Sequence, residues 1–327
     1  MAGPGPVQGF GPESFMDQAG NSRVSYGTAL VNIPPNHASG VIERPKWYRF
    51  EFRNDTAKHV FTVASTLLDK AAFFQGVERD SLPDAPRSAL LFVHGYNVSF
   101  DAATLRTAQL AYDLNFPGPA LLFSWPSQGA AADYPADEDR IAWATHDIED
   151  FIADALANTH LQHLYVIAHS MGNRGVTGAI VNLLAKRPEL APRLQEIILA
   201  APDIDAAIFR KDIAPRLVRS PQGTAVNVTL YVSAKDKALM ASQAFHKGAR
   251  VGEAGPALVV MPGIETVDAT DVDTGFLGHS YIGDEAALLN DLALLMYKKQ
   301  RAPARAGLGP KKGFKGTYYY FKPVGKR

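Results

Sequence analysis

The feature that most constrains the fold is a short apolar run that ends at a serine and continues into a helical pattern. Residues 164–168 are apolar, as in a buried strand, and residues 173–186 are compatible with a helix. Ser170 lies at the join, with the small residues Ala168 and Gly172 two positions away on either side. Small residues there permit a tight strand–turn–helix that exposes the serine hydroxyl at its apex. This context predicts that Ser170 is a nucleophile.

Short apolar runs alternate with helical patterns along most of the chain. The expected strands are 89–93, 120–123, 164–168, 196–200, 226–232 and 265–269, and the expected helices are 101–114, 139–157, 173–186, 237–247 and 284–299. Such alternation predicts an α/β fold with a mainly parallel, twisted sheet and helices on both faces. Reactive groups in such sheets gather beyond the carboxyl ends of the strands. Polar residues at those ends are therefore the candidates for a functional site.

The composition of the chain changes near both ends. Residues 1–40 are rich in Gly, Pro, Ser and Asn and are expected to form an irregular N-terminal arm before an α/β domain over residues 41–300. Within that domain, the alternating residues 47–52 predict a strand that pairs with residues 59–64. Residues 301–327 form a basic C-terminal tail that contains Lys and Arg but no Asp or Glu. We favour a solvated or loosely docked tail over one that binds RNA or an anionic membrane surface.

Bulk composition excludes several classes of protein. Lys+Arg and Asp+Glu both number 33, so no overall field indicates a nucleic-acid partner. The chain has no cysteine, which excludes disulfides, thiolate metal sites and a cysteine nucleophile. The N-terminus has neither a basic head nor an apolar stretch of signal-peptide length, and no apolar run approaches the length of a membrane span. These features predict a cytoplasmic protein.

A serine hydroxyl needs a base to take its proton, so Ser170 requires a histidine. His279 lies in a turn-rich segment after the last expected strand and before the final helix. A loop in that position brings an imidazole over the strand ends. His169 adjoins the serine, but neighbours across a tight turn point in different directions. His279 is therefore the predicted base.

The imidazole in turn needs a carboxylate that holds its tautomer. Asp236 follows the expected strand 226–232, and Asp203 follows the expected strand 196–200. Both fit the chain order of serine, acid and histidine. We favour Asp236 and keep Asp203 as the alternative acid, because the sequence Pro-Asp-Ile-Asp around Asp203 also fits a helix cap or a turn.

Acyl transfer also requires two backbone N–H groups that stabilise the developing oxyanion. One is expected from Met171, directly after the serine. The other is expected from Tyr96, because a buried strand there runs into His94 and Gly95, and a glycine lets the backbone approach a ligand. No Walker phosphate loop, dinucleotide-binding glycine motif or His-Glu-x-x-His motif is present in the sequence. We therefore expect no cofactor and no metal.

These motifs occur together in a known superfamily. In chain order they are a strand ending in His94-Gly95, the segment Ala168-His-Ser-Met-Gly172, Asp236 and His279. This order resembles the α/β-hydrolase superfamily. Four segments more narrowly resemble its bacterial DUF900 branch, a domain of unknown function: Phe92–Asn97, Phe123–Ser127, Ala201–Asp205 and Gly278–Tyr281. The resemblance covers roughly residues 45–300 and implies the α/β-hydrolase fold with a Ser-Asp-His triad. The sequence departs from the superfamily at Ala168, where glycine is usual. Alanine is small enough to keep the turn.

The combined features predict a serine esterase. The expected reaction is hydrolysis of small carboxylic esters with short- to medium-length acyl chains through an acyl-enzyme intermediate. One alternative is a lipase or lysophospholipase that the basic tail brings to an anionic lipid surface. A second alternative is a non-catalytic binding protein that retains the fold.

Overall fold

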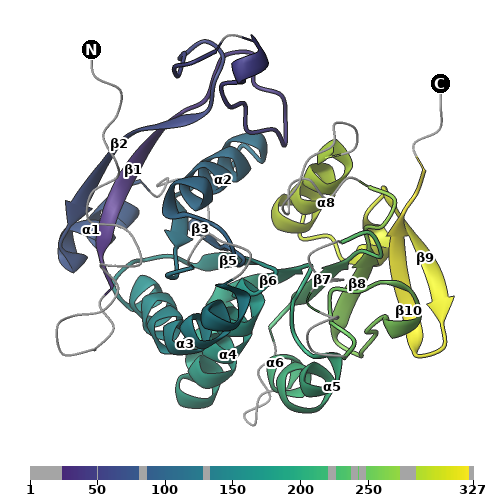
Figure 1. The fold of residues 1–327 in the computed structure, drawn as a ribbon. Coiled ribbons are helices and arrows are strands. Elements are labelled where there is room, and N and C mark those ends of the chain that lie inside the picture. Colours follow the sequence, from purple (N-terminus) through teal and green to yellow (C-terminus); the bar gives the residue numbers. More distant parts are fainter. Residues whose placement is uncertain are drawn as a thin grey trace.

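The computed structural model describes residues 24–49, 51–80, 87–127, 133–219, 226–236, 242, 248–272 and 285–323. These residues form a two-stranded hairpin and an eight-stranded sheet. Helices cover both faces of the larger sheet (Figure 1). In the part of the chain so described, no helix is both long and apolar enough to cross a membrane.

The large sheet has the strand order β4-β3-β5-β6-β7-β8-β10-β9, and every neighbouring pair is parallel except β10 with β9. Its strands are β3 (Ser88–Val93), β4 (Ala120–Phe123), β5 (His163–His169), β6 (Leu194–Ala200), β7 (Val228–Val232), β8 (Ile264–Asp268), β9 (Leu308–Gly313) and β10 (Gly316–Phe321). The central strands are buried along most of their length, which explains their continuous apolar runs. The prediction of a mainly parallel sheet with helices on both faces is confirmed.

The large sheet separates two apolar cores. Leu91 faces a core formed with α3 (Tyr134–Ala157), α4 (Gly172–Lys186) and α6 (Ala214–Val218). Its neighbour Leu90 faces the opposite core, formed with α2 (Phe100–Asp113) and α8 (Glu285–Tyr297). The shorter elements are α1 (Lys70–Arg79), α5 (Ala206–Ile208), the π-helical turn η5 (Phe209–Ile213) and the 3-10 turns η2 (Trp47–Arg49), η4 (Pro188–Arg193), η6 (Gly255–Ala257) and η8 (Ala302–Ala304). The expected helix at 237–247 lies outside the described residues, apart from residue 242.

The N-terminal region differs from its prediction. Part of the segment expected to be an irregular arm forms strand β1 (Tyr26–Asn32), which pairs antiparallel with β2 (Phe61–Leu68). The expected strand at 47–52 is absent from the described residues, where the turn η2 stands instead. The ring of Tyr26 packs against phenylalanine rings of α1 and α3, and these contacts hold β1 against the body of the protein. The small residues Gly-Thr-Ala that follow Tyr26 conceal the strand in the sequence.

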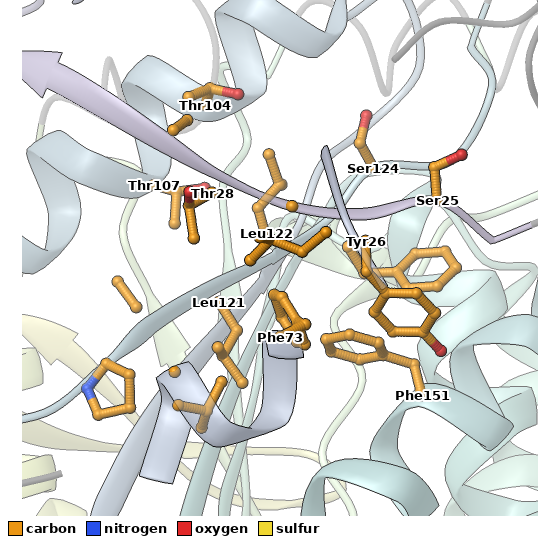
Figure 2. Close-up of a pocket in the computed structure, with 18 of the residues that line it drawn as sticks. Ser25, Tyr26, Thr28, Phe73, Thr104, Thr107, Leu121, Leu122, Ser124 and Phe151 are labelled. Carbon is orange, nitrogen blue, oxygen red and sulfur yellow. The ribbon is translucent and has the colours of Figure 1, made fainter. Parts of the chain in front are cut away.

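The hairpin does not join the large sheet, and a pocket of about 760 Å³ separates β1 from β4 (Figure 2). Consecutive residues line it on both sides, at 24–29 and at 119–124. Alternate residues of a strand point to opposite faces, so unbroken runs indicate that both strands meet the pocket with their edges. Ser170 is not among the described residues that line it. The pocket therefore lies at the side of the sheet.

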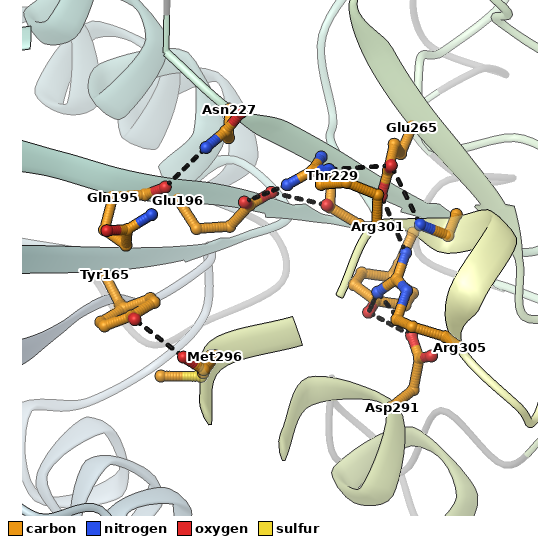
Figure 3. A network of polar contacts seen from close by, with 12 residues as sticks. Tyr165, Gln195, Glu196, Asn227, Thr229, Glu265, Asp291, Met296, Arg301 and Arg305 are labelled. Carbon is orange, nitrogen blue, oxygen red and sulfur yellow. Dashed lines mark hydrogen bonds and ion pairs between the residues drawn. The ribbon is translucent and has the colours of Figure 1, made fainter. Parts of the chain in front are cut away.

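The prediction of a solvated or loosely docked basic tail is wrong for the described residues. β9 and β10 form a hairpin, and β10 pairs in parallel with β8, so the segment extends the large sheet. Arg301 pairs with Glu196 and Glu265, and Arg305 pairs with Glu265 and Asp291 (Figure 3). These two arginines neutralise carboxylates of the sheet and of α8. The contacts account for part of the basic character of the segment without an external anion.

Removing the charge of Arg305 is expected to destabilise the protein strongly. The buried guanidinium lies 2.9 Å from Asp291 and 3.1 Å from Glu265. Arg305→Met should lower the free energy of unfolding by about 3–5 kcal/mol, because Asp291 is left buried without its cation. Urea unfolding measures this loss. Lys311→Met, at an exposed position of β9, is the control and should change stability by less than about 0.5 kcal/mol. Equal losses in the two variants would contradict the prediction.

Candidate active site

The candidate site lies at the carboxyl edge of the large sheet. Residues that follow parallel neighbouring strands meet at one edge. The predicted site residues at this edge are Tyr96 after β3, Ser170 and Met171 after β5, Asp203 after β6 and Asp236 after β7. The predicted base, His279, lies outside the described residues.

Ser170 lies in a strained turn between β5 and α4. Its φ is +48°, in the left-handed region that residues other than glycine rarely adopt. The N–H of Ser170 donates to the carbonyl of Ala200 at 3.0 Å. The carbonyl of Ser170 accepts from the N–H groups of Asn173 and Asp203, each at 3.2 Å. Strain of this kind persists only where surrounding contacts fix it, and it concentrates at functional sites.

Two glycines allow the end of β3 to approach this turn. A Cβ on Gly172 would lie 2.3 Å from the carbonyl oxygen of His94. A Cβ on Gly95 would lie 2.9 Å from the Cβ of Ser170. Both distances are well inside ordinary contact of about 3.5 Å, so neither position accommodates a side chain. Gly95 and Gly172 are therefore required for the same reason, which is the close approach of the end of β3 to the turn at Ser170.

The two predicted oxyanion donors flank this contact. Met171 follows Ser170 directly, and Tyr96 follows Gly95, whose backbone approaches Ser170. Among the described residues, neither the N–H of Met171 nor that of Tyr96 donates a hydrogen bond to another protein group. Within that part of the chain, neither N–H group has a protein acceptor, which is the condition that the predicted role requires.

His94 supports the loop that carries Tyr96. Its ring is completely buried and stacks on Trp125, with ring centroids 5.2 Å apart. Nδ1 of His94 lies 2.7 Å from the carbonyl oxygen of Gly95, and Nε2 lies 3.0 Å from Oγ of Ser124. Burial lowers the pKa of His94 to about 4. A neutral ring that donates from Nδ1 and accepts at Nε2 satisfies both nitrogens.

We expect His94 to make stability depend on pH below neutrality. An unfolded histidine binds a proton near pH 6.5, whereas folded His94 stays neutral down to about pH 4. The unfolded state therefore binds more protons across this window, so stability falls as the pH drops from 6.5 to about 4, by about 3 kcal/mol in total. Urea unfolding at a series of pH values measures the slope. His94→Gln cannot titrate and should lose this component; an unchanged pH dependence in that variant would contradict the prediction.

Asp203 is buried in a polar network of its own. Its carboxylate accepts from Oγ of Ser242 at 2.7 Å and from the hydroxyl of Tyr134. Arg250 and Arg174 lie 3.3 Å and 3.4 Å from its oxygens. Burial, together with the charge of Asp203, raises the pKa of Tyr134, so the phenol stays protonated and donates. These partners occupy the carboxylate with groups other than histidine, which favours a structural role for Asp203.

Asp236 lies in the turn after β7 and is half-buried. This turn contacts the turn after β8, because the N–H of Ala234 donates to Oγ1 of Thr270 at 2.9 Å. The chain that leads from β8 toward residue 279 therefore starts beside the turn that carries Asp236. Burial raises the pKa of Tyr96, and the negative charges of Asp203, Asp137 and Asp236 add to this shift in decreasing order. Asp236 thus lies within electrostatic range of the Tyr96 side chain.

Asn173 is a supporting residue that sequence reasoning missed. Its side-chain amide donates to the carbonyl of Ser170 at 2.9 Å and to that of Ala200 at 3.1 Å, so it ties the turn to β6. Asn173 is completely buried in the first turn of α4. An amide among the apolar residues of a helix that packs on the sheet is the sequence signal that could have identified it.

One protein family and several solved structures resemble this chain. Residues 70–297 match the family described as "Alpha/beta hydrolase of unknown function (DUF900)". A predicted CIB-like hydrolase from Thermoplasma acidophilum is 13% identical, with a TM-score of 0.37, and the match covers 66% of this chain and 89% of that one. A putative cell surface hydrolase from Lactobacillus plantarum is 12% identical, with a TM-score of 0.36 and coverages of 66% and 94%. No curated protein matches the chain.

Proposed function

The chain belongs to the DUF900 family of α/β hydrolases, and we propose that it is a serine hydrolase that cleaves carboxylic esters. The observation that carries this proposal is the strained turn at Ser170, with a φ of +48° between β5 and α4. A serine in such a turn presents its hydroxyl at the top of the sheet, where a substrate binds. The available N–H groups of Met171 and Tyr96 support the proposal, because acyl transfer needs donors on both sides of the nucleophile.

In the proposed reaction, Oγ of Ser170 attacks the carbonyl carbon of the ester while His279 takes the hydroxyl proton. The N–H groups of Met171 and Tyr96 stabilise the negative charge that develops on the carbonyl oxygen. His279 then gives its proton to the leaving alcohol, and the acyl group remains on Ser170. A water molecule repeats the sequence and releases the carboxylic acid.

We propose Asp236 as the carboxylate that orients His279. The contact between the turns after β7 and β8, at Ala234 and Thr270, supports this choice, because the segment that leads to His279 begins there. The hydrogen bonds and ion pairs already made by Asp203 count against the alternative acid.

Hydrolysis of a series of p-nitrophenyl esters, from acetyl to dodecanoyl, tests the proposed function. Purified protein is expected to cleave the short and medium members with saturation kinetics. Failure of the folded protein to cleave any member of the series would contradict the proposal.

A further inference from the structure

A loop at the end of the β1–β2 hairpin presents a group of unburied aromatic side chains. We call residues 44–49 and 51–58 the aromatic loop. Trp47, Tyr48 and Phe52 in this loop are 78%, 57% and 76% exposed. The rings of Trp47 and Tyr48 contact each other, with centroids 6.1 Å apart. Large apolar side chains that gather on a protein surface mark a site of interaction. Trp and Tyr in particular are enriched at protein interfaces and at membrane surfaces, where the ring is in an apolar environment and its N–H or O–H stays in contact with water.

The aromatic loop is fixed by hydrogen bonds, so its exposed rings belong to an ordered backbone. Nδ2 of Asn32 donates to the carbonyls of Thr56 and His59, at 3.1 Å and 2.8 Å. The N–H of Lys46 donates to a carboxylate oxygen of Glu51 at 3.0 Å. These hydrogen bonds join Lys46 to Glu51 and Thr56 to β1, while the side chains of Trp47, Tyr48 and Phe52 are exposed.

Cations accompany the exposed rings. In the aromatic loop, Lys or Arg stands at positions 44, 46, 49, 53 and 58, and Asp or Glu at positions 51 and 55. Nζ of Lys46 lies 5.9 Å from the ring centroid of Tyr48, and Arg53 is exposed next to Phe52 in the chain. Aromatic rings and cationic side chains with long apolar stems both favour the boundary between lipid headgroups and acyl chains. Arg44 pairs with Asp101 and Lys58 with Asp55, so the attraction to an anionic leaflet is assigned to the exposed Lys46 and Arg53 beside the rings.

The aromatic loop is anchored at the same edge of the large sheet as Ser170. Arg44 pairs with Asp101 at 3.2 Å, and Oγ1 of Thr62 donates to Asp101 at 2.7 Å. Asp101 lies in the first turn of α2, which begins just after the segment that carries Tyr96. Figure 1 shows the loop beyond the end of the hairpin and beside α2. A surface that binds the loop therefore approaches the edge that carries the candidate site.

We propose that the aromatic loop docks the protein on a surface of anionic phospholipid, and that the substrate of the candidate site is a lipid ester held in that surface. The choice of substrate rests on the proposed hydrolase function, whereas the docking does not.

A second exposed ring provides an internal comparison. Phe314 is 106% exposed in the turn between β9 and β10, with Lys312 and Lys315 nearby in the chain. Because β10 runs parallel to β8, this turn lies at the opposite, amino edge of the sheet. Docking through Phe314 would direct the candidate site away from the lipid.

Co-sedimentation with vesicles tests the docking without any measurement of activity. The wild type should bind vesicles made of equimolar phosphatidylcholine and phosphatidylglycerol at least about tenfold more tightly than vesicles made of phosphatidylcholine alone. The double variant Trp47→Ser/Phe52→Ser should weaken binding to the mixed vesicles by at least about tenfold, because it removes two rings that would be buried in the lipid on docking. Arg53→Glu should weaken it as well, and the matched control Phe314→Ser should bind like the wild type.

The docking is refuted if the wild type does not sediment with the mixed vesicles, or if Phe314→Ser loses as much binding as the double variant. It is also refuted if the protein binds no vesicles and instead forms a dimer that the double variant abolishes in analytical ultracentrifugation. Hydrolysis of a soluble p-nitrophenyl ester should be unchanged in the double variant. Intact vesicle binding by a protein that hydrolyses no ester would contradict the proposed function alone.

Discussion

Replacing Ser170 by alanine is expected to lower kcat/KM for a soluble p-nitrophenyl ester by at least about 10⁴-fold, because the variant has no nucleophile. Stability should change little, since alanine keeps the Cβ that is strained at a φ of +48°. Ser170→Gly separates strain from chemistry. It should be equally inactive, yet more stable by about 1 kcal/mol, because glycine adopts the left-handed region without steric cost.

Steady-state kinetics and urea unfolding of the two Ser170 variants, side by side, check both parts of this prediction. Activity in Ser170→Ala above about one tenth of wild type would exclude the serine as the nucleophile. A loss of stability in Ser170→Gly would show that the strain assigned to this turn is wrong.

Asp236→Asn and Asp203→Asn are expected to damage the protein in different ways. Asp236→Asn should lower kcat by about 10⁴-fold, because an amide holds the wrong tautomer of the histidine. Its stability should stay close to that of the wild type, since Asp236 is half-buried in a turn. Asp203→Asn should lower the free energy of unfolding by about 3–5 kcal/mol, because Arg250 and Arg174 lose the charge that compensates them.

Kinetics measured well below the unfolding midpoint of each variant separate these effects. Asp205→Asn serves as the control, because Asp205 caps α5 close to Asp203 in the chain and has no role in the proposed reaction. Asn caps a helix about as well as Asp, so this variant should change stability by less than about 0.5 kcal/mol and leave kcat near that of the wild type. A stable Asp203→Asn with a larger loss of kcat than Asp236→Asn would reverse the assignment of the acid.

The large sheet was predictable because its strands are buried on both faces and therefore appear as apolar runs. The expected strand at 120–123 coincides with β4, and the expected strand at 164–168 lies within β5. The turn at Ser170 was also predictable, because its signal is local: an apolar run, the small residues Ala168 and Gly172 on either side of the serine, and a helical pattern directly afterwards.

Elements held by distant contacts were not predictable in the same way. β1 depends on the packing of Tyr26 against rings of α1 and α3, while its own residues are only partly buried. The C-terminal hairpin depends on acids far along the chain that pair with Arg301 and Arg305. In a single sequence, these cations are indistinguishable from a solvated basic tail.

The same limit applies to the choice between the two acids. Asp203 and Asp236 both follow parallel strands, so strand position alone does not separate them. We favour a structural role for Asp203 because of Tyr134, Ser242 and Arg250, which lie far from it in the sequence and surround it in the fold.

Covalent labelling by a fluorophosphonate reports whether Ser170 is an activated nucleophile in the folded protein. The wild type should gain one adduct per chain, located at Ser170 by peptide mass spectrometry. Labelling should be lost in Ser170→Ala and in protein unfolded by urea, because activation depends on the folded site. Absence of an adduct on the folded wild type, or an adduct at another serine, would contradict the role of Ser170 as the nucleophile.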